Sequence, residues 1–535
     1  MPRKSRLQLI FPALFLIAVM AGYFLTRTAD PAKEVPRASP KPASQARQST
    51  LPANPALTRT ARRANADPDR DAPPFAIANE RIARFNDDAS YRKFLAGLSG
   101  RGLRLLGKSD RLRAVRFGWG DDFDPSDLDD AGLGYNYIVT IPAPPDAGAQ
   151  AGAVGFGRNA LAWLGVGQDN SAWGKGVTVA LLDSGVNDHT ALNGGNGKVT
   201  AITLTELGAG GVQLGHGTAV ASIISGDHPL TPGVAPASDL LSIRITDAEG
   251  TSNSFTLAEG ILRAADSGVD IINISMGSYG NSSLVADAVK YAQEKGVVIV
   301  ASSGNGGLAA LAYPAAYEGV IAVGAVEGTG EHLDFSNRGD GLDISAPGFQ
   351  INAAWGEELL TSFSGTSASA PFISGAIAAA MSENPHMTAR QAADLVLGVA
   401  NDAGYPGDDP VYGSGILALD RVMEHGTPGI YDVAIASQVL IPADAATSLP
   451  QVLVTVQNQG TETVINSPVS IVSPSGTQTV NISSLAPGQI HTIRVPVALP
   501  ANGDPITINA SVQSTEGDKD ASNNSRSDSF AQEQP

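Results

Sequence analysis

The 535-residue chain contains no cysteine. This absence excludes a disulfide framework, a thiolate nucleophile and a metal site built on cysteine. Positive charge is scarce after residue 116: residues 117–535 hold 13 Lys and Arg against 44 Asp and Glu, whereas residues 1–116 hold 22 against 9. So acidic a body argues against nucleic acid as a partner. The basic residues 1–116 are predicted to dock on the acidic residues 117–535 through their opposite charge. The alternative is that the two parts are solvated separately.

Long apolar runs are also missing, with one exception near the start of the chain. Three basic residues within the first six positions precede Leu7–Leu25, which is almost wholly apolar. This pattern predicts an export signal in residues 1–25. We favour cleavage at the small residues around Val19–Ala21, and an uncut run would remain as a membrane anchor. Residues 26–74 are rich in Pro, Ala, Ser, Arg and Asn without apolar periodicity, which predicts a disordered linker.

An acid, a base and a nucleophile stand in three short stretches, Asp183-Ser184-Gly185, Gly215-His216-Gly217-Thr218 and Gly365-Thr366-Ser367. A serine hydroxyl is a poor nucleophile at neutral pH. It needs an imidazole to take its proton and a carboxylate to orient that imidazole. We therefore predict Asp183, His216 and Ser367 as the catalytic residues.

Each of these tripeptides occurs a second time, and the context distinguishes the copies. The first Asp-Ser-Gly follows the pattern of a buried strand, whereas the second, at Asp266, ends a helical pattern. The first His-Gly-Thr opens an apolar helix face, whereas the second, at His425, is followed by linker residues. The Gly-Thr-Ser that ends at Ser367 begins a helix of small residues, and the copy that ends at Ser252 is assigned to a polar loop.

A fourth candidate is Asn305, in a tight turn after the apolar run Val297–Ala301. The tetrahedral intermediate of acyl transfer carries an oxyanion, whose hydrogen-bond donors must be in place before the charge develops. The Asn305 amide is one candidate donor. The other is the backbone N–H of Ser367, at the start of the predicted helix.

These motifs resemble those of the subtilisin-like serine peptidases. The resemblance implies that Asn305 is the oxyanion residue and that the substrate cleft has two walls, which consist of Ser275, Met276 and Gly277 and of Ser303 and Gly304. It also implies binding of extended peptides through main-chain hydrogen bonds, hence broad specificity. The sequence departs from many relatives at Ala219 and Ser222, where small side chains keep the helix packing.

A cofactor is not predicted. The stretch from Gly226 to Gly233 is short and leaves little room for the calcium-binding loop of some relatives. Asp188 and Asp227 are weighed as cation ligands, and solvated loop acids are the preferred interpretation. We predict no metal site, and calcium has no clear motif.

The chain divides into further predicted domains. Residues 155–425 alternate apolar runs with helical patterns, which predicts an α/β fold with a doubly wound, mostly parallel sheet. Residues 75–150 predict a small α+β unit that resembles the propeptide of these peptidases in position, and a plain accessory domain is the alternative. Residues 430–530 predict about seven short strands in an antiparallel sandwich that resembles a CARDB-type, immunoglobulin-like module.

The sequence thus predicts an exported serine endopeptidase made as a zymogen, whose own propeptide inhibits it until cleavage near residues 141–160. Its partners would be protein or peptide substrates, and the membrane only if residues 1–25 stay as an anchor. The alternative is an inactive surface or adhesion protein on a peptidase scaffold. An esterase of the α/β-hydrolase type fits poorly, because Ser367 lacks the Gly-x-Ser-x-Gly context and the triad order differs.

Overall fold

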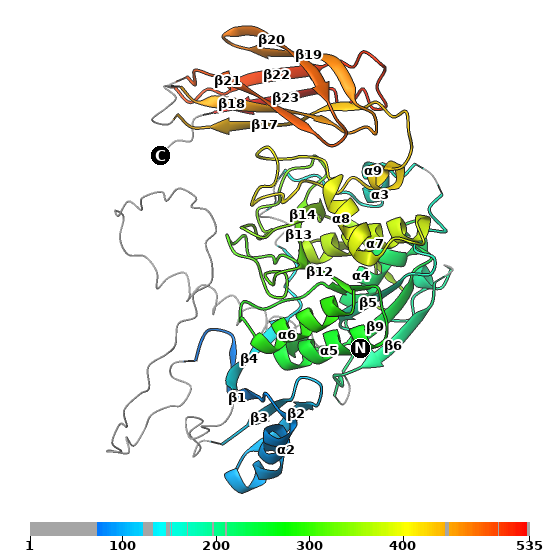
Figure 1. The fold of residues 1–535 in the computed structure, drawn as a ribbon, viewed down its shortest axis with the longest axis vertical. Helices are drawn as coiled ribbons and strands as arrows, with labels where there is room; N and C mark the ends of the chain where they lie inside the picture. Colours follow the sequence, from blue (N-terminus) through cyan, green and yellow to red (C-terminus); the bar gives the residue numbers. More distant parts are fainter. Residues whose placement is uncertain are drawn as a thin grey trace, which may run out of the picture. The chain divides into compact units, whose positions relative to one another are not determined.

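The computed structural model describes residues 72–120, 132–145, 150, 152–167, 169–194, 197–208, 211–443, 449–500 and 502–531. The predicted export signal and almost all of the predicted linker lie outside the described residues. Figure 1 shows the described chain from its N-terminal α+β unit through the α/β domain to the C-terminal strands.

The central domain contains a seven-stranded sheet in which every neighbouring pair of strands is parallel. In pairing order the strands are β14 (Ile344–Pro347), β13 (Val320–Val326), β12 (Val298–Ser302), β11 (Ile271–Ile274), β5 (Thr178–Asp183), β9 (Asp239–Arg244) and β6 (Val199–Thr203). This is the doubly wound, parallel α/β fold that the sequence predicts. The buried-strand pattern before Asp183 is β5, and the apolar run Val297–Ala301 corresponds to β12.

Helices cover both faces of this sheet, because alternate side chains of each buried strand point to opposite faces. On β5, Val179 and Leu181 belong to one core cluster, whereas Ala180 and Leu182 belong to the other. The first cluster packs against α4 (His216–Ser225), α7 (Thr366–Glu383) and α8 (Ala389–Gly398). The second packs against α5 (Ser254–Asp266) and α6 (Ser283–Glu294), which lie together on one face in Figure 1.

Shorter elements complete this domain. They are α3 (Ala160–Trp163), η4 (Thr190–Leu192), β7 (Asp227–His228), β8 (Thr231–Pro232), β10 (Thr251–Asn253), β15 (Ile351–Trp355), β16 (Leu359–Phe363) and α9 (Leu419–Glu424). The stretch from Gly226 to Gly233, predicted to be too short for a calcium loop, is the tight antiparallel hairpin β7–β8.

The N-terminal unit is an antiparallel sheet with one helix. Its elements are β1 (Ala76–Arg84), α2 (Asp88–Gly97), η1 (Ser99–Arg101), β2 (Arg104–Ser109), β3 (Ala114–Gly118) and β4 (Gly132–Thr140). Asp87 caps α2 by accepting a hydrogen bond from Ser90 N. The sheet order is β10-β4-β1-β3-β2, so its fifth strand comes from the central domain.

The C-terminal segment consists of seven antiparallel strands in two sheets. One sheet holds β17 (Val433–Ile441), β18 (Gln451–Asn458) and β21 (Ile490–Pro496). The other holds β20 (Gly476–Leu485), β19 (Val464–Ser473), β22 (Ile506–Val512) and β23 (Ser525–Phe530). Alternating apolar side chains of both sheets form one shared core, as in a β-sandwich. None of the helices in the described part of the chain is long and apolar enough to cross a bilayer.

Candidate active site

Asp183 and His216 are in direct contact. Asp183 is the last residue of β5 and His216 is the first residue of α4. The Asp183 carboxylate oxygens lie 2.9 and 3.0 Å from His216 Nδ1, and both side chains are almost fully buried. A further bond of 2.7 Å from Ser184 N to Asp183 Oδ1 fixes the carboxylate. Such a bond through Nδ1 holds the imidazole so that Nε2 is available as a base.

Ser367 is the second residue of α7, which begins after Gly365. Its hydroxyl donates a 2.8 Å hydrogen bond to the backbone oxygen of Ser275, and Ser275 Oγ donates to the backbone oxygen of Ser367 at 3.1 Å. Among the described residues, no hydrogen bond joins Ser367 Oγ to His216. The aromatic ring of Phe363, just before α7, packs edge-on against the His216 ring with centroids 5.2 Å apart.

The sheet order brings these groups to one edge. Strands β12, β11 and β5 are neighbours and parallel. Asp183 ends β5, Ser275 follows β11, and Asn305 follows β12. In an open α/β sheet, the carboxyl ends of the strands are where ligands bind. The structure therefore gathers the predicted acid, base, nucleophile and oxyanion residue in the region where such a sheet places its site.

Thr366 fixes the orientation of the Asn305 amide. Asn305 Oδ1 accepts hydrogen bonds from Thr366 N at 2.9 Å and from Thr366 Oγ1 at 2.8 Å. The oxygen is thus occupied, and the amide keeps Nδ2 as the donor for another acceptor. The backbone N–H of Ser367 lies in the first turn of α7, where such groups have no acceptor within the helix. Asn305 Nδ2, which lies beside Gly365, and the Ser367 N–H are therefore two donors at the start of α7.

One predicted wall of the cleft is occupied by the chain itself. Thr140, the last residue of β4, exchanges two backbone hydrogen bonds with Gly277, of 3.0 and 3.1 Å. On its other side, β4 pairs with β10, and Ile141 N donates to Gly250 O at 3.0 Å. Residues 138–141 therefore lie as an extended strand between β10 and Gly277.

The other predicted wall of the cleft, Ser303 and Gly304, is supported by the buried residue Asn337. Ser303 is fully buried and its hydroxyl donates to Asn337 O, so it supports the wall rather than lining it. Asn337 Oδ1 accepts from the backbone of Gly306 and Leu308, and Asn337 Nδ2 donates to Tyr279 Oη at 2.9 Å. Burial raises the pKa of the Tyr279 hydroxyl, which therefore stays neutral. Met276 is also fully buried, beneath Gly277.

Three contributors to the site are not predicted from the sequence. Ser252 is predicted in a polar loop, but it lies in β10, which pairs with residues 138–140. The other two are the supporting residues Thr366 and Asn337. Thr366 lies inside the motif that identified Ser367, so a search for its partners would have found it. Asn337 has no comparable signal.

Two of the three second copies, at Asp266 and His425, make their contacts elsewhere in the chain. Asp266 ends α5 and pairs with Arg111 and Lys295. His425 caps α9 through a bond between Nδ1 and Val422 O. Within the described residues, no group of three or more His, Cys, Asp or Glu could hold a metal ion.

Comparison with known proteins identifies the class. The model of the subtilase family matches residues 174–415. Subtilisin Savinase of Lederbergia lenta is 35% identical over 248 residues, which are 46% of this chain and 89% of that protein. The alkaline protease of Shouchella clausii is also 35% identical over 248 residues, which are 63% of its length.

A solved structure extends the likeness of fold beyond the central domain. Fervidolysin from Fervidobacterium pennivorans, a keratinolytic enzyme related to subtilisin, is 19% identical, with a TM-score of 0.55 over 82% of this chain and 89% of that chain. The chain belongs to the subtilase family. It is accordingly a serine-type endopeptidase, and the predicted resemblance is confirmed.

Proposed function

We propose that this endopeptidase cleaves extended peptide segments through an acyl-enzyme on Ser367, and that it is made as an exported zymogen. The observation that carries the proposal is the contact of Asp183 with His216 Nδ1 beside a serine at the start of α7. His216 takes the Ser367 proton, and Ser367 Oγ attacks the substrate carbonyl. His216 then gives the proton to the leaving amine, and water hydrolyses the ester.

The donors for the oxyanion are Asn305 Nδ2 and the Ser367 N–H. Thr366 holds the Asn305 amide before any charge develops, and this preorganisation makes such a donor effective. For the reaction to start, the Ser367 hydroxyl must leave the Ser275 carbonyl and turn to His216. A bound substrate with a free N–H at this position would satisfy that carbonyl and release the hydroxyl.

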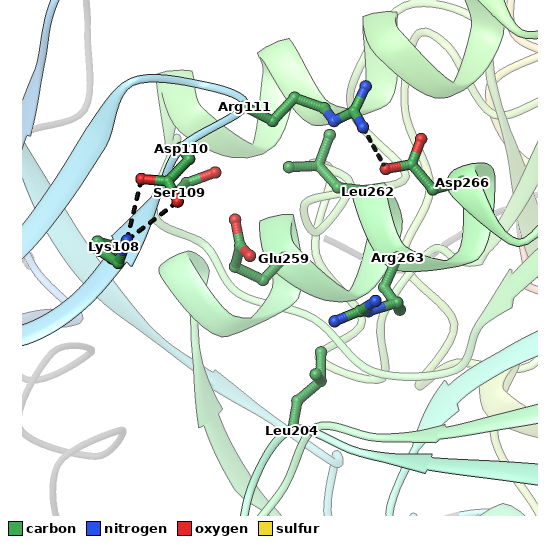
Figure 2. A pocket seen from close by; sticks show the side chains of 9 residues that line it. All are labelled: Lys108, Ser109, Asp110, Arg111, Leu204, Glu259, Leu262, Arg263 and Asp266. Atoms are coloured by element: carbon green, nitrogen blue, oxygen red, sulfur yellow. Dashed lines mark hydrogen bonds and ion pairs between the residues drawn. The ribbon is translucent and has the colours of Figure 1, made fainter.

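The N-terminal unit has the contacts of an intramolecular inhibitor. Its strand β4 occupies the cleft, and Asn136 Oδ1 accepts hydrogen bonds from Ser254 Oγ and Phe255 N at the start of α5. Figure 2 shows Arg111 reaching across to Asp266 of α5, with the charged atoms 2.8 Å apart. A second ion pair joins Arg84 to Asp287 of α6. These ion pairs agree with the predicted docking of the basic residues 1–116 on the acidic residues 117–535.

Export rests on the apolar run Leu7–Leu25 behind three basic residues. Protein and peptide substrates follow from the geometry of the cleft, where main-chain groups of Gly277 and Gly250 bind an extended strand.

The test is the Ser367→Ala substitution in the full-length chain. We expect turnover of a peptide substrate to fall by about 10⁶, and any self-cleavage after residue 141 to stop. Ser369→Ala is the matched control, since Ser369 is equally buried on the same helix and its hydroxyl has no partner among the described residues. A fluorophosphonate probe should label Ser367 in the Ser369→Ala chain. Processing that persists in the Ser367→Ala chain would contradict self-maturation.

A further inference from the structure

Residues 138–141, the docked segment, continue toward Ser367 in a defined register. Thr140 and Gly277 exchange both of their backbone hydrogen bonds, so they form a hydrogen-bonded pair of an antiparallel ladder. Such pairs recur every second residue, in opposite directions along the two strands. Regular continuation of the ladder beyond the observed Thr140–Gly277 bridge places Pro142 opposite Ser275. The bond from Ile141 N to Gly250 O on the other side indicates that the extended course is kept up to Pro142.

Proline breaks the ladder at this pair. In a regular ladder, the N–H of residue 142 would donate to the carbonyl oxygen of Ser275. Proline has no N–H, so it cannot make this bond. The carbonyl that the ladder leaves without its donor is the one that accepts the 2.8 Å hydrogen bond from Ser367 Oγ.

We infer that Pro142 is a positioning residue that protects the docked segment from self-cleavage. By leaving the Ser275 carbonyl to Ser367, it keeps the nucleophilic hydroxyl turned away from His216 while the segment is bound. This inference rests on the proposed catalytic role of Ser367. It assigns the Pro142–Ala143 bond as the one presented to the nucleophile, and it explains how a substrate-like strand can stay in the cleft uncut.

The protected reaction is ordinary peptide hydrolysis. Ser367 Oγ would attack the Pro142 carbonyl carbon, and the bond to the Ala143 nitrogen would break. His216 would pass the serine proton to the new amine, and water would release the Pro142 carboxylate. A residue with an N–H at position 142 would bond to Ser275 and free the serine hydroxyl for this sequence.

The experiment compares full-length Pro142→Ala with the unsubstituted chain after purification. Intact mass measurements over time report which bond is cut and how fast. We expect cleavage between residues 142 and 143 to be about tenfold faster in Pro142→Ala, because one hydrogen bond decides the orientation of the hydroxyl. Pro142→Gly also restores the N–H and should behave alike. Pro144→Ala is the control, since Pro144 is exposed and lies beyond the Ser275 pair.

Two results would overturn the inference. One is equal cleavage of the 142–143 bond in the unsubstituted and Pro142→Ala chains. The other is faster cleavage in the Pro144→Ala control as well, which would point to a general loosening of the segment. Melting temperatures of all variants establish that they fold.

A further variant and the probe separate this inference from the proposed function. The double variant Pro142→Ala with Ser367→Ala should not be cut. Cleavage in it, or a lack of fluorophosphonate labelling in every chain with Ser367, would contradict the catalytic assignment. Equal labelling of the unsubstituted and Pro142→Ala chains, with equal cleavage, would contradict only the role of Pro142.

Discussion

The N-terminal unit and the C-terminal sandwich each contact the central domain through a buried side-chain amide, Asn136 and Gln457, but among the described residues the N-terminal unit adds a backbone ladder. The N-terminal unit contributes a strand whose backbone pairs with β10 and Gly277. The sandwich contributes the amide of Gln457, which accepts from Asp402 N at 3.0 Å and donates to Ala400 O at 3.1 Å. Backbone ladders can be replaced by any extended peptide, whereas a side-chain amide between two particular main-chain groups cannot.

The ion pairs do not distinguish the two contacts, because the charged side chains on both sides are partly exposed. The pairs of Arg84 and Arg111 with the helices of the central domain are partly exposed. On the other side, the pairs of Lys519 with Asp420 and Glu424 are partly exposed as well, and the buried contact is the one made by Gln457. We propose on this basis that the backbone contact of the N-terminal unit is exchanged for substrate, whereas the contact at Gln457 persists.

The largest effect is expected from removing the buried amide of the sandwich contact. Gln457→Ala leaves Asp402 N without its acceptor and takes one donor from Ala400 O. An unsatisfied buried group costs about 1–3 kcal/mol. We expect the midpoint of urea denaturation to fall accordingly. Gln451→Ala, at the other end of the same strand, is the control, and an equal loss in both variants would refute a special role for Gln457.

A smaller, pH-dependent effect is expected at Asp402. Burial raises the pKa of this carboxyl to about 7, and one of its oxygens has no partner among the described residues. An unfolded aspartate titrates near 4. Between these values the folded chain holds a proton that the unfolded chain has released, so stability falls as the pH rises from about 4 to 7. The loss is complete above the folded pKa.

Asp402→Asn removes this titration while its side-chain oxygen can still accept from Gly407 N. We expect the drop in melting temperature between pH 5 and pH 8 to shrink by the equivalent of about 1 kcal/mol, which allows for screening of the group by solvent. Asp340→Asn, at an exposed position, is the control. An unchanged pH dependence of the melting temperature in Asp402→Asn would show that ionisation of Asp402 does not destabilise the contact with the C-terminal sandwich at high pH.

The sequence predicted the central fold well because its signals are local. The run Val177–Leu182 is apolar and β-branched, and the residue after it, Asp183, ends a buried strand. His216 and Ser367 each fall at the first turn of a helix with small or apolar residues. Local periodicity is enough to place such residues at the ends of elements.

What the sequence could not predict depends on pairing across long separations. Ser252 was assigned to a loop because its strand forms only by pairing with Val139, more than a hundred residues earlier. The orientation of the Ser367 hydroxyl depends on the carbonyl of Ser275, just after β11, and the support from Asn337 depends on its bonds with residues 303–308 and with Tyr279. Such contacts leave no periodic pattern in the chain.

The smallest effect is expected from the partly exposed ion pairs between the N-terminal unit and the central domain. Arg111→Ala removes the pair with Asp266, which is worth about 0.2–1 kcal/mol and is screened by salt. Hydrolysis of a reporter peptide by the full-length chain should rise by about 1.4- to 5-fold at low salt, because the N-terminal unit leaves the cleft more readily, and the gain should vanish at high salt. Arg92→Ala removes the same charge from a pair with Asp88 inside the N-terminal unit. If both variants behaved alike, net charge rather than the docking contact would hold the unit in place.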